Sequence, residues 1–191
     1  MRRLLTVLMA LTAFVAVPAW ASSLNLNLSN NSVRGIYSQP LAGYNRWGTP
    51  YFDAGLLYSD DHNTKMGHLG LQVVGDANAQ QLLLRVGVGG RLYYADSHPG
   101  SGAALGLGGH FSARLPQYNR ISLRGRAFFA PDILAFNDFQ QFYEYGLDLD
   151  YRVLKRANVY AGYRQVRAKL SHSGHTVALD SGFLVGLRLG F

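Results

Sequence analysis

The sequence predicts an all-β fold, an antiparallel transmembrane β-barrel preceded by a cleaved signal peptide. Apolar and polar residues alternate in segment after segment, and turn-forming residues separate these segments at short, regular intervals. The polar faces also combine charges with many of the chain's 22 glycines. A water-soluble barrel would turn its apolar face inward, and its outer face would not need small residues. The lumen of a narrow membrane barrel does need them, so we expect the membrane form.

The N-terminal segment predicts export. Arg2 and Arg3 precede an apolar run over 4–17, and Ala19-Trp20-Ala21 supplies a cleavage site. The run is shorter than the roughly 20 residues that a membrane-spanning helix needs. We therefore predict a signal peptide over 1–21 and a single β-barrel domain over 22–191.

Ten strands account for the mature chain. A short alternating pair, 23–29 and 33–38, turns at Asn30-Asn31. Eight longer segments begin near Pro50, Lys65, Leu82, Gly102, Arg120, Gln140, Asn158 and Val177. The sheet must close, because unpaired edge groups are costly in hydrocarbon, and an even count places both termini on one side. The alternative is eight strands with an N-terminal hairpin or plug.

The strand period of two assigns each residue to one face. Between 143 and 153, apolar or aromatic residues alternate with Glu144, Gly146, Asp148, Asp150 and Arg152. The lumen charge network predicted in this way consists of Arg85, Arg91, Arg114, Arg120, Arg124, Arg126, Glu144, Asp148, Asp150, Arg152, Arg164, Arg167, Asp180 and Arg188. Aromatic residues near strand ends predict interfacial girdles, namely Tyr93, Tyr94, Phe128, Phe129, Tyr143, Tyr151, Tyr160 and Phe191.

The predicted charges in the lumen have two interpretations. A loop centred near Ala135 would set Arg126 opposite Glu144 and Arg120 opposite Asp150. Such pairs could form an ion-selective constriction, or a salt-bridge network that fills a barrel too narrow to conduct. Small barrels are usually filled by side chains, which favours the second interpretation.

The segment 157–170 breaks the alternation. Val159, Ala161 and Tyr163 point to lipid, but the apolar positions then shift phase. A β-bulge at Arg164–Gln165 would turn both Arg164 and Arg167 inward and set Arg167 against Asp180. Without it, one arginine would meet hydrocarbon at a cost of roughly 2–4 kcal/mol.

Two further stretches suggest contacts outside the lumen. The chain ends on an apolar ladder, Phe183, Val185, Leu187, Leu189 and Phe191, which resembles the C-terminal signal read by barrel-assembly machinery. The longest outer loop, 130–138, carries Ile133, Leu134 and Phe136. We expect these three side chains to plug the mouth, with contact to lipopolysaccharide or a partner protein as the alternative.

Several stretches resemble the YfaZ family of bacterial outer-membrane proteins. They are LNLNLSNN near the mature start, GLLYSDD at 55–61, FAPDILAFND at 129–138, YRVLKRANVYAGYRQVR at 151–167 and SGFLVGLRLGF at the end. The resemblance implies a barrel in the outer membrane of a Gram-negative bacterium. It implies no reaction and supplies no catalytic residues.

We therefore expect a non-catalytic outer-membrane barrel, structural or weakly conducting, with a surface-binding module acting through 130–138 as the alternative. A rim hydrolase or acyltransferase would use His98, Ser171, His172 or His175 with Asp60, Asp61 or His62, but such residues gather in polar loops by chance. We expect no catalytic, cofactor-binding or metal site. The expected partners are membrane lipid, lipopolysaccharide and the assembly machinery. The spread of the basic surplus argues against nucleic acid, and we favour a monomer.

Overall fold

The computed structural model describes residues 22–41, 48–60, 63–77, 82–98, 100–171 and 174–191. The predicted signal peptide lies outside these ranges, so its boundary stays a prediction. No helix among the described residues is long and apolar enough to cross a membrane.

The described chain is built almost entirely of antiparallel strands. They are β1 (Ser23–Ser29), β2 (Ser32–Pro40), β3 (Thr49–Ser59), β4 (Thr64–Asp76), β5 (Leu83–Ser97), β6 (Gly100–Arg114), β7 (Ile121–Ala130), β8 (Ala135–Asn137), β9 (Phe139–Leu154), β10 (Ala157–Leu170) and β11 (Thr176–Gly190). Two short 3-10 helices, η2 (Pro116–Tyr118) and η3 (Asp132–Leu134), lie in the connections on either side of β7.

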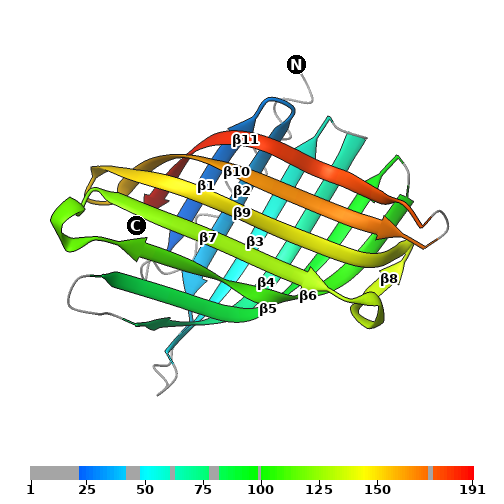
Figure 1. Ribbon diagram of the computed structural model, residues 1–191, viewed down its shortest axis with the longest axis horizontal. Helices are drawn as coiled ribbons and strands as arrows, with labels where there is room; N and C mark the ends of the chain where they lie inside the picture. Colours follow the sequence, from blue (N-terminus) through cyan, green and yellow to red (C-terminus); the bar gives the residue numbers. More distant parts are fainter. Residues whose placement is uncertain (1–21, 42–47, 61–62, 78–81, 99, 172–173) are drawn as a thin grey trace.

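Ten of these strands close a barrel, which confirms the predicted fold and strand count. Each pairs with its neighbours, and β11 returns to β1, with Leu26 facing Leu187. The N-terminal pair is part of the wall, so the alternative with eight strands is wrong. The short β8 adds to the edge of β6 beyond the end of β7, where Phe136 pairs with Ala103 (Figure 1).

The barrel has two different ends. The C-terminus and the connections 115–120 and 155–156 lie at one, which we call the terminal end (Figure 1). The connections β1–β2, β3–β4, β5–β6, β7–β9 and β10–β11 lie at the other, the far end.

The two faces of the wall have the predicted orientation. On β9, Leu147 and Leu149 point outward and are 50% and 57% exposed, whereas Glu144 and Asp148 point inward and are 1% and 2% exposed. Apolar side chains therefore face lipid, and charges are sheltered from it.

Some glycines on the inner face are needed for close strand packing. A Cβ on Gly89 would meet the backbone carbonyl of Leu71, and a Cβ on Gly108 would meet that of Ala127. Backbone atoms cannot move aside as a flexible side chain can, so these positions require glycine.

The far half of the lumen is apolar, which the sequence did not predict. Its filling, which we call the apolar plug, consists of Leu57, Met66, Tyr93, Ala95, Ala104, Phe128, Ala130, Phe139, Phe142, Val166, Ala168, Leu170 and Leu179. The ring of Tyr93 lies 4.5 Å from that of Phe142 and 6.4 Å from that of Phe128, centroid to centroid. The girdle prediction is therefore wrong for Tyr93 and Phe128. It is also wrong for Tyr160, whose buried hydroxyl donates to Asn25.

The bulge predicted in β10 is also wrong. Arg164 and Gln165 pair regularly with both neighbouring strands, and the irregularity lies in β11, where Leu179 is skipped between the partners of Val166 and Arg167. The inward phase runs unbroken from Arg164 to Val166, Ala168 and Leu170, because these apolar residues enter the plug. Arg167 consequently points outward and is exposed, and Asp180 binds Arg164 instead.

Candidate functional site

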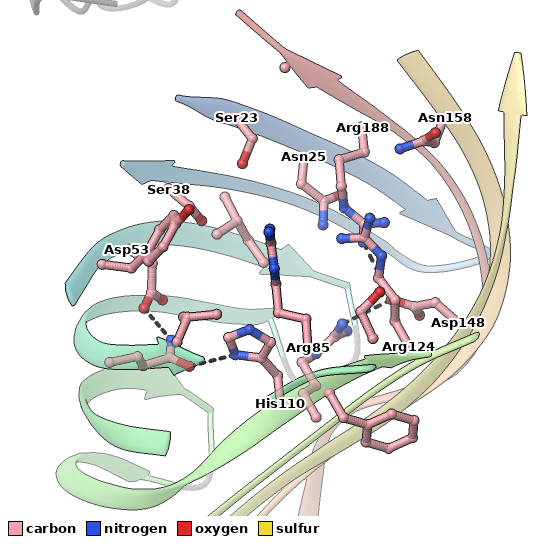
Figure 2. Close-up of a pocket in the computed structure, with 18 of the residues that line it drawn as sticks. Ser23, Asn25, Ser38, Asp53, Arg85, His110, Arg124, Asp148, Asn158 and Arg188 are labelled. Carbon is pink, nitrogen blue, oxygen red and sulfur yellow. Dashed lines mark hydrogen bonds and ion pairs between the residues drawn. The ribbon is translucent and has the colours of Figure 1, made fainter. Parts of the chain in front are cut away.

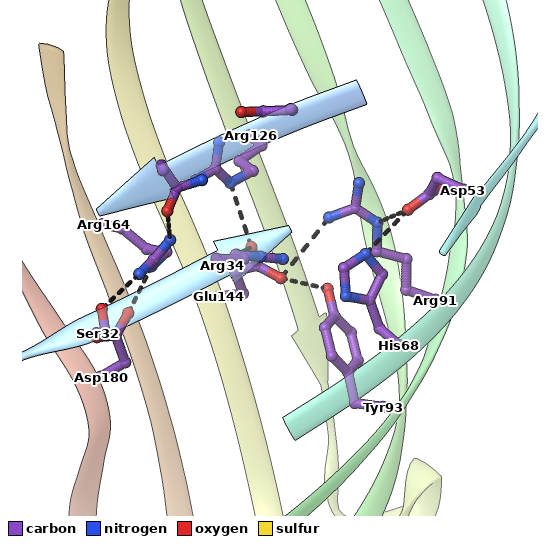
Figure 3. Close-up of polar contacts among 12 residues, drawn as sticks. Ser32, Arg34, Asp53, His68, Arg91, Tyr93, Arg126, Glu144, Arg164 and Asp180 are labelled. Carbon is purple, nitrogen blue, oxygen red and sulfur yellow. Dashed lines mark hydrogen bonds and ion pairs between the residues drawn. The ribbon is translucent and has the colours of Figure 1, made fainter. Parts of the chain in front are cut away.

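A layer of buried ion pairs crosses the middle of the lumen, and Glu144 is its hub. One carboxylate oxygen accepts from Arg34 at 2.6 Å and from Arg126 at 3.2 Å, and the other accepts from the Tyr93 hydroxyl at 2.7 Å. Arg91 adds a cation 3.7 Å away. Figure 3 shows side chains from strands far apart in sequence converging on this carboxylate.

A second acid, Asp53, completes the layer on the β3–β5 side. Its carboxylate lies 2.9 Å from Arg91 Nε, 3.2 Å from His68 Nε2 and 2.6 Å from the Gln72 amide that donates to it. The Oε1 atom of Gln72 lies 2.7 Å from His110 Nδ1. The predicted network omitted Asp53 and Arg34, although the alternation of β2 and β3 places both on the inner face.

Arg164 anchors the first strand pair to the last. It donates to Asp180 at 2.5 Å, to Asn27 at 2.6 Å and to Ser32 at 2.9 Å. All four side chains are almost fully buried. One inward arginine therefore joins β10 to β11, β1 and β2 across the seam where the barrel closes.

The arginines nearer the terminal end share two more carboxylates. Asp148 lies 3.1 Å from Arg126 and 3.7 Å from Arg188, and Asp150 pairs with Arg188 and, at 3.2 Å, with Arg124. An ion pair between Arg126 and Glu144 thus exists, as the sequence analysis expected.

The predicted register between β7 and β9 is nevertheless wrong. Arg126 faces Gly146, Arg124 faces Asp148, and Ser122 faces Asp150. The connection between these strands contains η3 and β8, so it is not a symmetric turn about Ala135. Arg120 lies exposed at the end of β7 and is 3.4 Å from the Tyr151 hydroxyl, away from Asp150.

A cavity of about 970 Å³ occupies the terminal half of the lumen. We call it the vestibule. The predicted residues Arg85, Arg114 and Arg152 line it, together with Lys155 and Arg156 of the β9–β10 turn. Figure 2 shows Arg85 and His110 on one wall and Arg124 and Arg188 on the other. Exposed residues at its rim leave it open at the terminal end.

The loop 130–138 does not close the far end of the lumen, so the prediction that its three apolar side chains plug the barrel is wrong. Ile133 is 84% exposed and Phe136 is 52% exposed, and of the three apolar residues only Leu134 packs against the apolar plug. The far half is filled instead by inward strand residues, which leaves Ile133 and Phe136 on the surface.

The C-terminal ladder lies on the lipid face. Phe183, Val185 and Leu187 are exposed there, and Leu189 is partly exposed, whereas the exposed Phe191 follows the end of β11 and lines the vestibule. Its recognition during assembly stays a prediction.

The rim residues considered for hydrolysis are only partly described. Ser171 donates its hydroxyl to the backbone carbonyl of Asp138 at 3.3 Å, while Asp61, His62 and His172 fall outside the described residues. Among the described residues, no three His, Cys, Asp or Glu side chains are grouped to hold a metal ion.

Comparison with known proteins gives one family. A family model described as "YfaZ precursor" matches residues 1–191. No curated protein matches.

Three solved structures align with most of this chain at low sequence identity. A KdgM porin aligns at a TM-score of 0.45 and 12% identity, over 90% of this chain and 99% of that one. A KdgM porin in complex with disordered oligogalacturonate gives 0.45 and 13%, over the same shares. A chain from work described as "Unveiling the Mechanism Behind the in-meso Crystallization of Membrane Proteins" gives 0.46 and 11%, over 90% and 83%.

Proposed function

The chain belongs to the YfaZ precursor family, and we propose that it is a non-catalytic outer-membrane barrel with a closed lumen and a vestibule open to the periplasm. The outward apolar face and the signal-peptide pattern support this location. An even strand number puts both termini on the periplasmic side, so the far end faces the cell exterior.

The apolar plug is the observation that carries this proposal. Its residues come from eight of the ten barrel strands, and each of them is at most 6% exposed. An ion that entered the far half would have to shed its water among aromatic and aliphatic side chains, which is costly without compensating contacts. The ion-pair layer behind the plug adds a second barrier.

Planar-bilayer recording tests the closed lumen. The wild-type barrel should give no open-channel steps, whereas Phe128→Ala combined with Phe142→Ala should give them, because two of the largest plug side chains are then removed. Wild-type steps equal to those of the double variant would contradict the proposal.

Phe129→Ala with Tyr143→Ala is the matched control. These residues follow Phe128 and Phe142 by one position on the same strands, and their rings stack 5.1 Å apart on the outer face. This control should remain silent in the bilayer although it loses the same amount of aromatic surface.

The loop 130–138 supports a second candidate function, surface binding. A contiguous apolar patch on a protein surface marks a contact site, whereas apolar side chains that are exposed singly do not. Ile133 and Phe136 are three positions apart and both exposed, which is the arrangement that a binding role requires.

A further inference from the structure

The vestibule has a strong excess of positive charge. Its lining contains nine Arg and Lys side chains but only three acidic side chains, those of Asp53, Asp76 and Asp148. Each of these carboxylates is already bound: Asp53 to Arg91 and His68, Asp76 to Arg85, and Asp148 to Arg126 and Arg188. The acids of the wall therefore do not neutralise the remaining cations.

Four of those cations form no ion pair within 4 Å among the residues that the structure describes. They are Arg114 at the end of β6, Arg152 near the end of β9, and Lys155 and Arg156 in the following turn. The Arg114 and Arg152 guanidinium groups repel each other, and Asp150 attracts Arg114 less strongly than Arg152 repels it. Two like charges on one cavity wall that form no ion pair of their own favour binding of an anion near them.

Neutral polar groups extend the same surface. Asn25, Asn158 and Ser23 also line the vestibule, and Figure 2 shows them around the same hollow as Arg188. Deeper in the cavity, Arg91 lines the wall, but its guanidinium is already paired with Asp53 and Glu144. Arginine forks beside amide and hydroxyl donors are suited to phosphate and carboxylate oxygens.

We propose that the vestibule binds a soluble small anion carrying two or more negative charges on phosphate or carboxylate groups, which enters from the terminal end. The ion-pair layer and the plug form its closed back wall, so the anion is held there and does not pass through. Entry from the periplasm rests on the proposed orientation, but binding itself does not. The volume of about 970 Å³ admits a solute of several functional groups with its water.

Calorimetric titration of the refolded barrel in a zwitterionic detergent tests the site, with inorganic pyrophosphate and citrate as probes. Binding of either probe to the wild-type barrel is expected, and it should weaken as salt is added. Arg114→Gln with Arg152→Gln should lower the affinity by about tenfold or more, the size of effect expected when direct charged contacts are lost.

Arg120→Gln is the matched control, since Arg120 lies exposed at the same end but does not line the vestibule. It should leave the affinity unchanged. Failure of both probes to bind, equal affinity in the double variant, or an equal loss in the control would overturn the site. Heat-dependent mobility on gels shows that each variant is folded.

The source of the ligand is tested separately. Adding phosphatidylglycerol to the micelles should leave pyrophosphate binding unchanged, because the proposed ligand is soluble; loss of that binding would overturn a soluble ligand in favour of a lipid headgroup. Titration in detergent is independent of conductance, so an open lumen would refute the proposed function without removing the site.

Discussion

At the scale of single residues, the lumen is organised by carboxylates that each serve several cations. Glu144 is 1% exposed and is contacted by Arg34, Arg91 and Arg126 as well as by the Tyr93 hydroxyl. A charge so far from water is tolerated only when it is paired and hydrogen-bonded. The same carboxylate holds the Tyr93 ring of the plug, so the polar layer and the apolar plug are physically joined.

Glu144→Gln should destabilise the barrel by about 3–5 kcal/mol, because three buried arginines would lose their shared anion. Guanidinium unfolding in lipid vesicles measures this loss. Asp76→Asn is the control: its pair with Arg85 has side chains 57% and 58% exposed, so the expected cost is at most about 1 kcal/mol. Equal costs for the two variants would argue against Glu144 as the hub.

At the scale of elements, β10 shows why alternation must be interpreted with the lumen contents in mind. Its inward face is polar as far as Arg164 and becomes apolar at Val166. A rule that assigns all apolar residues to lipid then predicts a bulge that does not exist. The actual irregularity in β11 buries both Leu179 and Asp180, one for the plug and one for Arg164.

The two arginines of β10 provide a direct test of this assignment. Arg164→Gln should cost about 3–5 kcal/mol, since buried Asp180 would lose its cation. Arg167→Gln should cost less than about 1 kcal/mol or should stabilise the barrel, because the outward side chain makes no such buried pair and a charge on the lipid face is itself unfavourable. Chemical unfolding of the refolded barrels measures the free energy of unfolding of both variants, which carry the same substitution three positions apart. A larger loss for Arg167→Gln would support the predicted bulge instead.

At the scale of the whole molecule, the barrel is asymmetric along its axis. An apolar plug fills the far half, an ion-pair layer crosses the middle, and a basic vestibule opens at the terminal end. A uniform pore would not need such a gradient. Under the proposed orientation, the vestibule is accessible from the periplasm, and the loop 130–138 is accessible from the cell exterior.

Cysteine labelling tests the orientation, since the chain has no cysteine of its own. A maleimide that cannot cross the outer membrane should label Ile133→Cys on intact cells but Lys155→Cys only after permeabilisation. The reverse pattern would invert the barrel. Protection of the thiol at 133 on cells, but not in the purified protein, would indicate that a partner or lipopolysaccharide covers the loop.

The sequence by itself determined most of the strands and the face of most residues, because a period of two is a local property of each segment. It left eight and ten strands as alternatives, and the closure of β11 on β1 decided for ten. It did not determine which inward residues meet. Arg34 and Glu144 are 110 positions apart, and Arg164 reaches Ser32 over 132. Only closure of the sheet and the register of β7 on β9 bring such groups together. Alternation also does not show whether the lumen holds water or apolar side chains. Only the tertiary structure therefore revealed the apolar plug, the outward position of Arg167 and the vestibule cations that form no ion pair.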